Sequence, residues 1–183
     1  MPAQNIPIQI TEETAMRLIQ AITCVVLSLP IFVHAAPAHV HGAAKMDLAV
    51  DGNKLTVSIE IPLDNMVGFE HLPKTDKQKT ALAESMKILG DGSDLFIPTV
   101  AADCKIESVD VGDPFPGGKA KGGGHADVDA DYVFRCAKPA ALKGLETTLF
   151  KHFSRLHRID VQRATAGGQG ASTMTPKQPR TSW

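Results

Sequence analysis

Residues 125–136, H-A-D-V-D-A-D-Y-V-F-R-C, decide the fold because apolar and polar side chains alternate strictly along them. A period of two predicts a strand whose successive side chains point to opposite faces of a sheet. The apolar face, which we expect to be core, consists of Ala126, Val128, Ala130, Tyr132, Phe134 and Cys136. The polar face begins with His125, Asp127, Asp129 and Asp131. Successive members lie roughly 7 Å apart at about 3.3 Å rise per residue, so this face is either a solvated surface or part of a cation site.

Two further alternating runs, residues 45–50 and 54–61, precede this strand and predict a β-hairpin. They are separated by Asp51-Gly52-Asn53, and Asp-Gly between alternating runs is among the strongest short-range hairpin signals. Four more segments also read as strands: 104–111, 145–150, 158–164 and 169–175. A short turn or helix is expected around residues 151–156, and Pro176 ends the last strand before a polar tail.

One main helix is predicted over residues 76–89, with Thr75 as its N-cap and Gly90 after its end. Its apolar stripe would cover one face of a sheet, and residues 62–71 before it are expected to form a loop that folds back over the core. About seven strands and one helix, without strand-helix alternation, predict an α+β fold. We expect a mainly antiparallel, sandwich-like sheet.

The N-terminal residues 1–35 are predicted to be a secretory signal peptide. Arg17 precedes a mostly apolar run over residues 18–33, and small residues follow that run at the expected cleavage position. Met16 would be a conventional start, so residues 1–15 are either an over-long start or an unusual n-region. The apolar run is interrupted and too short for a membrane span. We therefore expect export to the periplasm, with no membrane attachment after cleavage.

The remaining residues, 36–183, suffice for one domain with a single core. The formal net charge of the whole chain is −1, so the basic excess typical of nucleic-acid binding is missing. The sequence also lacks a nucleophile elbow, a phosphate loop and a dinucleotide fingerprint, and we expect no enzyme. A small metallohydrolase using His39-x-His41 is a weaker alternative, because the chain is too short for the usual barrel.

Two cysteines remain after processing, Cys104 and Cys136. In an exported chain an even pair most simply forms a disulfide, and a thiolate metal pair is the alternative reading. Closing the intervening loop would stabilise the fold by about 3.5 to 4 kcal/mol in the chain-entropy model. Residues 112–124 lie inside that ring and read as a flexible, glycine-rich loop.

Several histidines lie near carboxylates in the sequence, which is the donor chemistry that zinc accepts where thiolates are missing. The pairs are His39 with His41, Glu70 with His71, and His125 with Asp127. No single motif supplies the three or four ligands of a zinc site, so a site would be assembled across the fold. Each pair also has a plain structural reading, as a polar terminus, a hydrogen-bond partner near a helix start, or a solvated strand face.

Five motifs, in this order, resemble the ZrgA-like periplasmic zinc-binding family. They are H-V-H-G at 39–42, P-L-D-N-M-V-G-F-E-H at 62–71, C-K-I at 104–106, the organising strand at 125–136, and G-Q-G-A-S-T-M-T-P at 168–176. The resemblance implies an exported, non-catalytic protein that binds zinc and assists its import under zinc limitation. It also implies a partner, a component of a zinc uptake transporter.

One departure from the family's pattern narrows the expected site. Members of the family often carry a histidine- and aspartate-rich insertion before the H-A-D motif, whereas this chain has G-G-K-A-K-G-G-G at 117–124. Its lysines would repel a cation, so we expect only a compact site. The candidate ligands are His39, His41, His71, His125 and Asp127. Zinc is the expected metal, copper and nickel suit the same donors, and protons should compete below about pH 6.5.

A second hypothesis keeps the scaffold without the metal. In it the protein is a metal-independent periplasmic interaction module, residues 62–71 form its docking surface, and the histidines are incidental.

Overall fold

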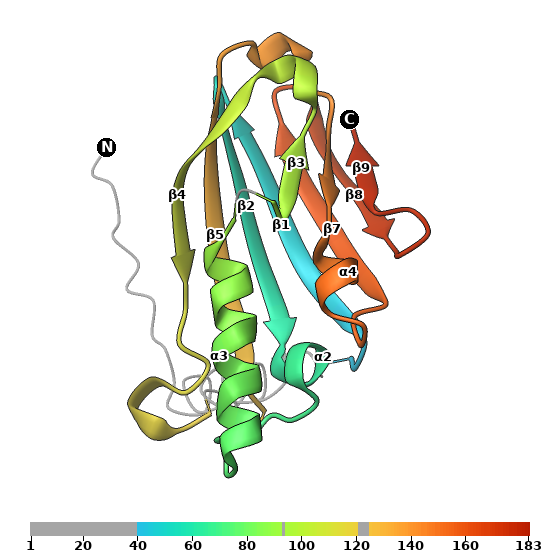
Figure 1. Ribbon diagram of the computed structural model, residues 1–183. Helices are drawn as coiled ribbons and strands as arrows, with labels where there is room; N and C mark the ends of the chain where they lie inside the picture. The colour runs from blue at the N-terminus through green and yellow to red at the C-terminus, as the bar shows by residue number, and fades with distance from the viewer. Residues whose placement is uncertain (1–39, 93, 121–124) are drawn as a thin grey trace, which may run out of the picture. The chain divides into compact units, whose positions relative to one another are not determined.

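The computed structural model describes residues 40–92, 94–120 and 125–183 (Figure 1). The predicted signal peptide, His39 and the end of the glycine-rich loop lie outside the described residues. All elements below belong to the unit His39–Trp183. Among the described residues, no helix is both long and apolar enough to cross a bilayer.

The core of the fold is a six-stranded sheet in the order β4-β5-β2-β1-β7-β8 (Figure 1). Its strands are β1 (Ala43–Asp51), β2 (Lys54–Pro62), β4 (Cys104–Val111), β5 (Asp127–Cys136), β7 (Arg158–Thr165) and β8 (Gly168–Met174). Neighbours pair antiparallel except β1 and β7, which run parallel. The predicted α+β class and the largely antiparallel sheet are therefore confirmed, with one parallel pair that the sequence did not indicate.

The hairpin and the organising strand form as their patterns predict. Gly52 adopts a positive φ of 57° in the β1–β2 turn, a conformation that glycine reaches without strain. All six residues of the predicted core face are buried, Ala126 just before β5 and the other five along it, while Asp129 and Asp131 are exposed. The alternation thus separates the core face of the sheet from its solvent face.

A second, three-stranded sheet has the order β3-β6-β9. It contains β3 (Phe96–Pro98), β6 (Gly144–Thr147) and β9 (Arg180–Ser182). The prediction of seven strands is wrong because β3 and β9, at three residues each, are too short to show a period of two. The polar tail also packs against the large sheet, since the Thr181 side chain is buried and its hydroxyl is 2.7 Å from that of Ser172 on β8.

The predicted main helix is present, and two shorter helices are found besides it in the described residues. Helix α3 (Asp76–Gly90) forms as expected and begins with a capping box made by Thr75 and Gln78. It lies along the core face of the large sheet (Figure 1), where the buried Tyr132 hydroxyl donates a hydrogen bond to the Leu89 carbonyl at 2.8 Å. Burial raises the pKa of Tyr132.

Two short helices accompany the main one. Helix α2 (Leu63–Val67) lies within the expected loop 62–71. Helix α4 (Leu149–His152) takes the end of the strand predicted over 145–150 and the first residues of the turn or helix predicted around 151–156. Single turns of 3₁₀-helix cover Val100–Ala102, Pro116–Gly118 and Pro139–Ala141. Local periodicity does not specify helices this short, which tertiary packing stabilises.

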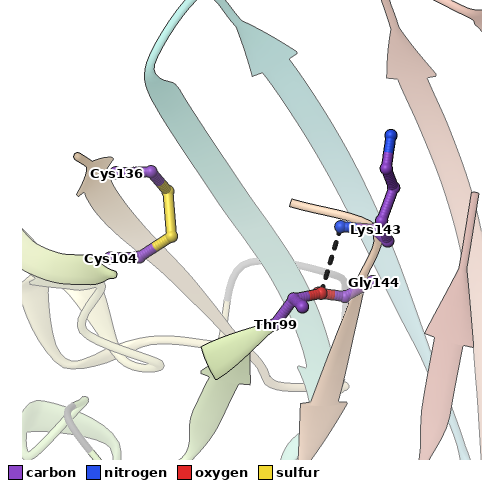
Figure 2. The surroundings of a disulfide bond; sticks show 5 residues. All are labelled: Thr99, Cys104, Cys136, Lys143 and Gly144. Atoms are coloured by element: carbon purple, nitrogen blue, oxygen red, sulfur yellow. Dashed lines mark hydrogen bonds between the residues drawn. A yellow bond between two sulfur atoms is a disulfide. The ribbon is translucent and has the colours of Figure 1, made fainter. Parts of the chain in front are cut away.

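The predicted disulfide between Cys104 and Cys136 is present (Figure 2). The two cysteines face each other directly in the antiparallel register of β4 and β5. The thiolate metal pair considered as an alternative is therefore excluded while the bond is intact.

Candidate metal-binding edge

Three strands begin at one edge of the large sheet, and β2 ends there. Ala43 at the start of β1 pairs with Arg158 at the start of β7, and Pro62 at the end of β2 pairs with Asp127 at the start of β5. The residues just before β1, β5 and β7 include His41, His125 and His157. We call these three residues the histidine edge.

His41 is held by a buried carboxylate from helix α2. Its Nδ1 lies 3.2 Å from Asp64 Oδ2, and the Arg155 guanidinium donates to both oxygens of Asp64, at 2.8 and 3.1 Å. Arg155 Nε also donates to the Asp64 backbone carbonyl at 2.9 Å. The Asp64 side chain is only 13% exposed, whereas the His41 side chain is 65% exposed. The imidazole is therefore anchored at one nitrogen and open to solvent elsewhere.

The charge on Asp64 is stabilised mainly by Arg155. The hydrogen bonds from the guanidinium hold the pKa of the Asp64 carboxyl below its ordinary value of 3.8, against the opposing effect of burial. Hydrogen bonding to His41 lowers this pKa further. Asp64 is therefore an anion at neutral pH, and its negative charge attracts a cation beside the His41 ring.

The backbone beside His41 is fixed by the fully buried Asn65. Its Oδ1 accepts a hydrogen bond from the Gly42 amide at 2.6 Å, and its Nδ2 donates to the Ala43 carbonyl at 2.8 Å. Gly42 has a positive φ of 81°, and a Cβ at this position would lie 3.0 Å from the His157 ring. Helix α2 thus positions the entry to β1, and glycine is needed there for both conformation and space.

His125 is paired with Glu70, the second carboxylate of the 62–71 block. Its Nδ1 is hydrogen-bonded to Glu70 Oε2. The side chain of Glu70 is 14% exposed and that of His125 56% exposed. The other carboxylate oxygen, Glu70 Oε1, is buried and has no hydrogen bond to any residue that the structure describes. A backbone hydrogen bond from Leu63 to Ala126, at 2.8 Å, fixes helix α2 next to this pair.

The other predicted ligands occupy less organised positions. His71 is exposed, its Nδ1 lies 2.8 Å from the adjacent Leu72 carbonyl, and its ring stacks on Phe69 with 5.3 Å between centroids. Asp127 is half-buried at the start of β5. Within the described parts of the chain, no three histidine, cysteine or acidic side chains are grouped closely enough to hold a metal.

The structure therefore places two of the predicted ligands, His41 and His125, in separate histidine-carboxylate pairs. Neither Asp64 nor Glu70 was among the predicted ligands, although both lie in the 62–71 block that carries the resemblance. The adjacency of Glu70 and His71 in the sequence pointed to the wrong imidazole, because Glu70 contacts His125, 55 residues away. Only the contacts of the folded chain reveal these pairings.

Comparison with known proteins is consistent with this chemistry. A search of curated proteins found no match. The family model described as "ZrgA family zinc uptake protein" matches residues 38–183, which include every described element of the fold. The chain therefore belongs to the ZrgA family of zinc uptake proteins.

Proposed function

We propose that this protein is an exported, non-catalytic zinc-binding protein of the periplasm that assists zinc uptake, and that zinc binds at the histidine edge. The observation that carries the proposal is the pairing of two exposed imidazoles, His41 and His125, with two largely buried carboxylates at the same edge. Membership in a zinc uptake family and a disulfide suited to an oxidising compartment support the same reading.

A carboxylate bonded to Nδ1 prepares a histidine to bind a metal. It fixes the tautomer with the proton on Nδ1, so that Nε2 carries the lone pair, and it holds the ring in one orientation. His41 and His125 both have this arrangement, with Asp64 and Glu70 as the orienting carboxylates. Glu70 Oε1, which is buried and accepts no hydrogen bond from the described residues, adds negative charge that favours a cation at the neighbouring imidazole.

The two imidazoles come from strands on either side of β2. Neighbouring strands lie about 4.8 Å apart, so the starts of β1 and β5 are separated by about 10 Å. In the proposed site the two rings approach each other over the end of β2. His39, His71 and Asp127 supply further ligands, as the sequence predicts. A site that assembles on binding suits a transported metal, because a preformed four-ligand cage would release zinc slowly.

A calorimetric zinc titration tests this function. We expect the wild type to bind about one equivalent of zinc. The double variant His41→Ala, His125→Ala should bind zinc at least about tenfold more weakly, because it lacks two of the side chains proposed to coordinate the metal. The matched control is His152→Ala, which removes an exposed histidine that pairs with no carboxylate in the described part of the chain. Its affinity should stay within about twofold. Equal affinities in the double variant and the wild type would refute the site, and absence of zinc binding in the folded wild type would refute the function.

The metal-independent interaction module receives less support from the structure. Leu63 and Asn65 in the 62–71 block are fully buried, and Met66 and Val67 pack against the core. The apolar side chains of the block are therefore used to pack α2 against the sheet, and they offer little apolar surface to a partner. Binding of the same partner by metal-free wild type and the double variant would favour the module.

A further inference from the structure

An arginine occupies the core face of the large sheet at the end opposite to the histidine edge. On β7, Ile159 and Val161 are buried, and the period of two places Arg163 on the same face. Arg163 lies five residues beyond Arg158, so it is roughly 17 Å along the strand from the histidine edge. A small ligand bound by Arg163 would therefore not contact the proposed zinc ligands.

The Arg163 guanidinium lies against the backbone of β8. Its register partner there is Gly170, and a Cβ at Gly170 would come within 2.5 Å of the guanidinium carbon. Only glycine leaves room for this arrangement. The planar group is thus supported on one side by the strand, which fixes its direction and lowers the entropy lost when it binds a ligand.

Three other arginines of the fold are each paired with a carboxylate, and Arg163 differs from them. Arg135 pairs with Glu107, Arg155 with Asp64 and Arg158 with Asp160. Arg163 is half-buried, yet among the described residues it makes no ion pair and no side-chain hydrogen bond. Five N–H donors in a partly desolvated position are unfavourable without an acceptor, so the site favours an anion.

Arg163 lines a hollow of about 500 Å³ that also contains a second cation and an aromatic side chain. The hollow lies between the β1–β2 turn, the β7–β8 turn and residues 139–143, and Lys143 and Trp183 contribute to its walls. The Trp183 amide donates to the Lys143 carbonyl at 3.0 Å, which joins these two residues. In Figure 2 the Lys143 side chain extends away from Thr99, whose hydroxyl accepts a hydrogen bond from the Lys143 amide.

We propose that this hollow, the Arg163 pocket, binds a small organic carboxylate. The guanidinium offers the planar fork that matches a carboxylate, and Lys143 adds a second positive charge. The indole of Trp183 and the buried Leu142 supply apolar surface for a hydrocarbon body. An inorganic anion would satisfy the charges but leave that apolar wall unused, which favours an organic anion.

The indole of Trp183 provides a direct measurement of occupancy, because it is the only tryptophan in the sequence. Hexanoate, hexan-1-ol and inorganic phosphate are each titrated into the ¹⁵N-labelled protein at low salt while the indole N–H resonance is followed. We expect a saturable shift with hexanoate. We also expect about tenfold weaker binding of hexanol, which lacks the charge, and of phosphate, which lacks the apolar body.

The variant Arg163→Gln should weaken hexanoate binding by at least about tenfold. Arg158→Gln is the matched control, because it removes an arginine from the same strand that is paired with Asp160 and lies outside the pocket. Its affinity should change by less than about twofold. Gly170→Ala, which displaces the guanidinium without removing charge, should also weaken binding if the variant is folded.

Three results would overturn the proposal. They are the absence of a saturable indole shift with hexanoate, equal weakening in the Arg163 and Arg158 variants, and phosphate binding at least as tight as hexanoate binding. The last result would assign the pocket to inorganic anions instead. If the backbone spectrum shows that Arg163→Gln alters the fold, Lys143→Gln replaces it as the test, because Lys143 is exposed. We expect Lys143→Gln to weaken hexanoate binding by about threefold. Unchanged hexanoate affinity in Lys143→Gln would then count against the proposal.

Discussion

Asp64 determines the geometry of the histidine edge because it joins three parts of the chain. It lies on α2, accepts hydrogen bonds from Arg155 on the loop after α4, and contacts His41 before β1. Its charge is largely buried, so its partners must compensate for lost hydration. The residue is both a structural contact and the orienting group for a proposed ligand.

Replacing Asp64 with asparagine should lower the free energy of unfolding by about 1 kcal/mol near pH 6, since the exposed Arg155 limits the strength of the ion pair. Because the folded pKa of Asp64 is below 3.8, its contribution is complete above that pH and is lost as pH falls towards the folded value. Urea unfolding at about pH 6 and pH 3 checks both statements. The difference between wild type and variant should shrink at the lower pH.

Asp160→Asn is the matched control at the residue scale. Its partner Arg158 lies 3.1 Å away, and both side chains are 48% exposed, so the change should cost less than about 0.5 kcal/mol. Equal destabilisation by the two substitutions would show that Asp64 is an ordinary surface ion pair.

At the scale of elements, the capping box fixes where α3 begins. The Gln78 amide donates to Thr75 Oγ1 at 3.2 Å, and the Gln78 side chain accepts from the Thr75 amide at 3.3 Å. Thr75→Ala removes the first of these bonds and should destabilise the protein by about 1 kcal/mol in urea unfolding. Thr80→Ala, an exposed threonine within the same helix, should be neutral or slightly stabilising because alanine has the higher helix propensity. A loss of stability in both variants would contradict the assignment of Thr75 as the cap.

The elements that the sequence predicts are those with a long local pattern. The organising strand, the β1–β2 hairpin and α3 have eight or more patterned residues each, together with turn or cap signals. Helix α2 and strand β9 lack such patterns and form because the surrounding core accepts them. The candidate site follows the same division. The histidines are visible in the sequence, whereas Asp64 and Glu70 are identified only by contacts across 23 and 55 residues.

At the scale of the whole molecule, stability and proposed zinc binding depend on opposite ends of the large sheet. Cys136 ends β5 and Cys104 begins β4, whereas the histidine edge lies where β5 begins. The disulfide joins β4 and β5, the two strands at one side of the sheet. The loop residues 112–120 lie between the two cysteines in the sequence. Loss of the bond should therefore affect unfolding more than local geometry at the histidine edge.

The double variant Cys104→Ala, Cys136→Ala tests this separation. We expect the free energy of unfolding in urea to fall by about 3.5 kcal/mol, because the unfolded chain gains the freedom of a loop closed by cysteines 32 residues apart. Zinc affinity measured without urea, where the variant is still folded, should stay within about twofold of the wild type. A large loss of zinc affinity in a folded variant would mean that the disulfide transmits order along β5 to His125. In that case the two ends of the sheet would be coupled, and reduction of the bond would act on zinc binding as well as on stability.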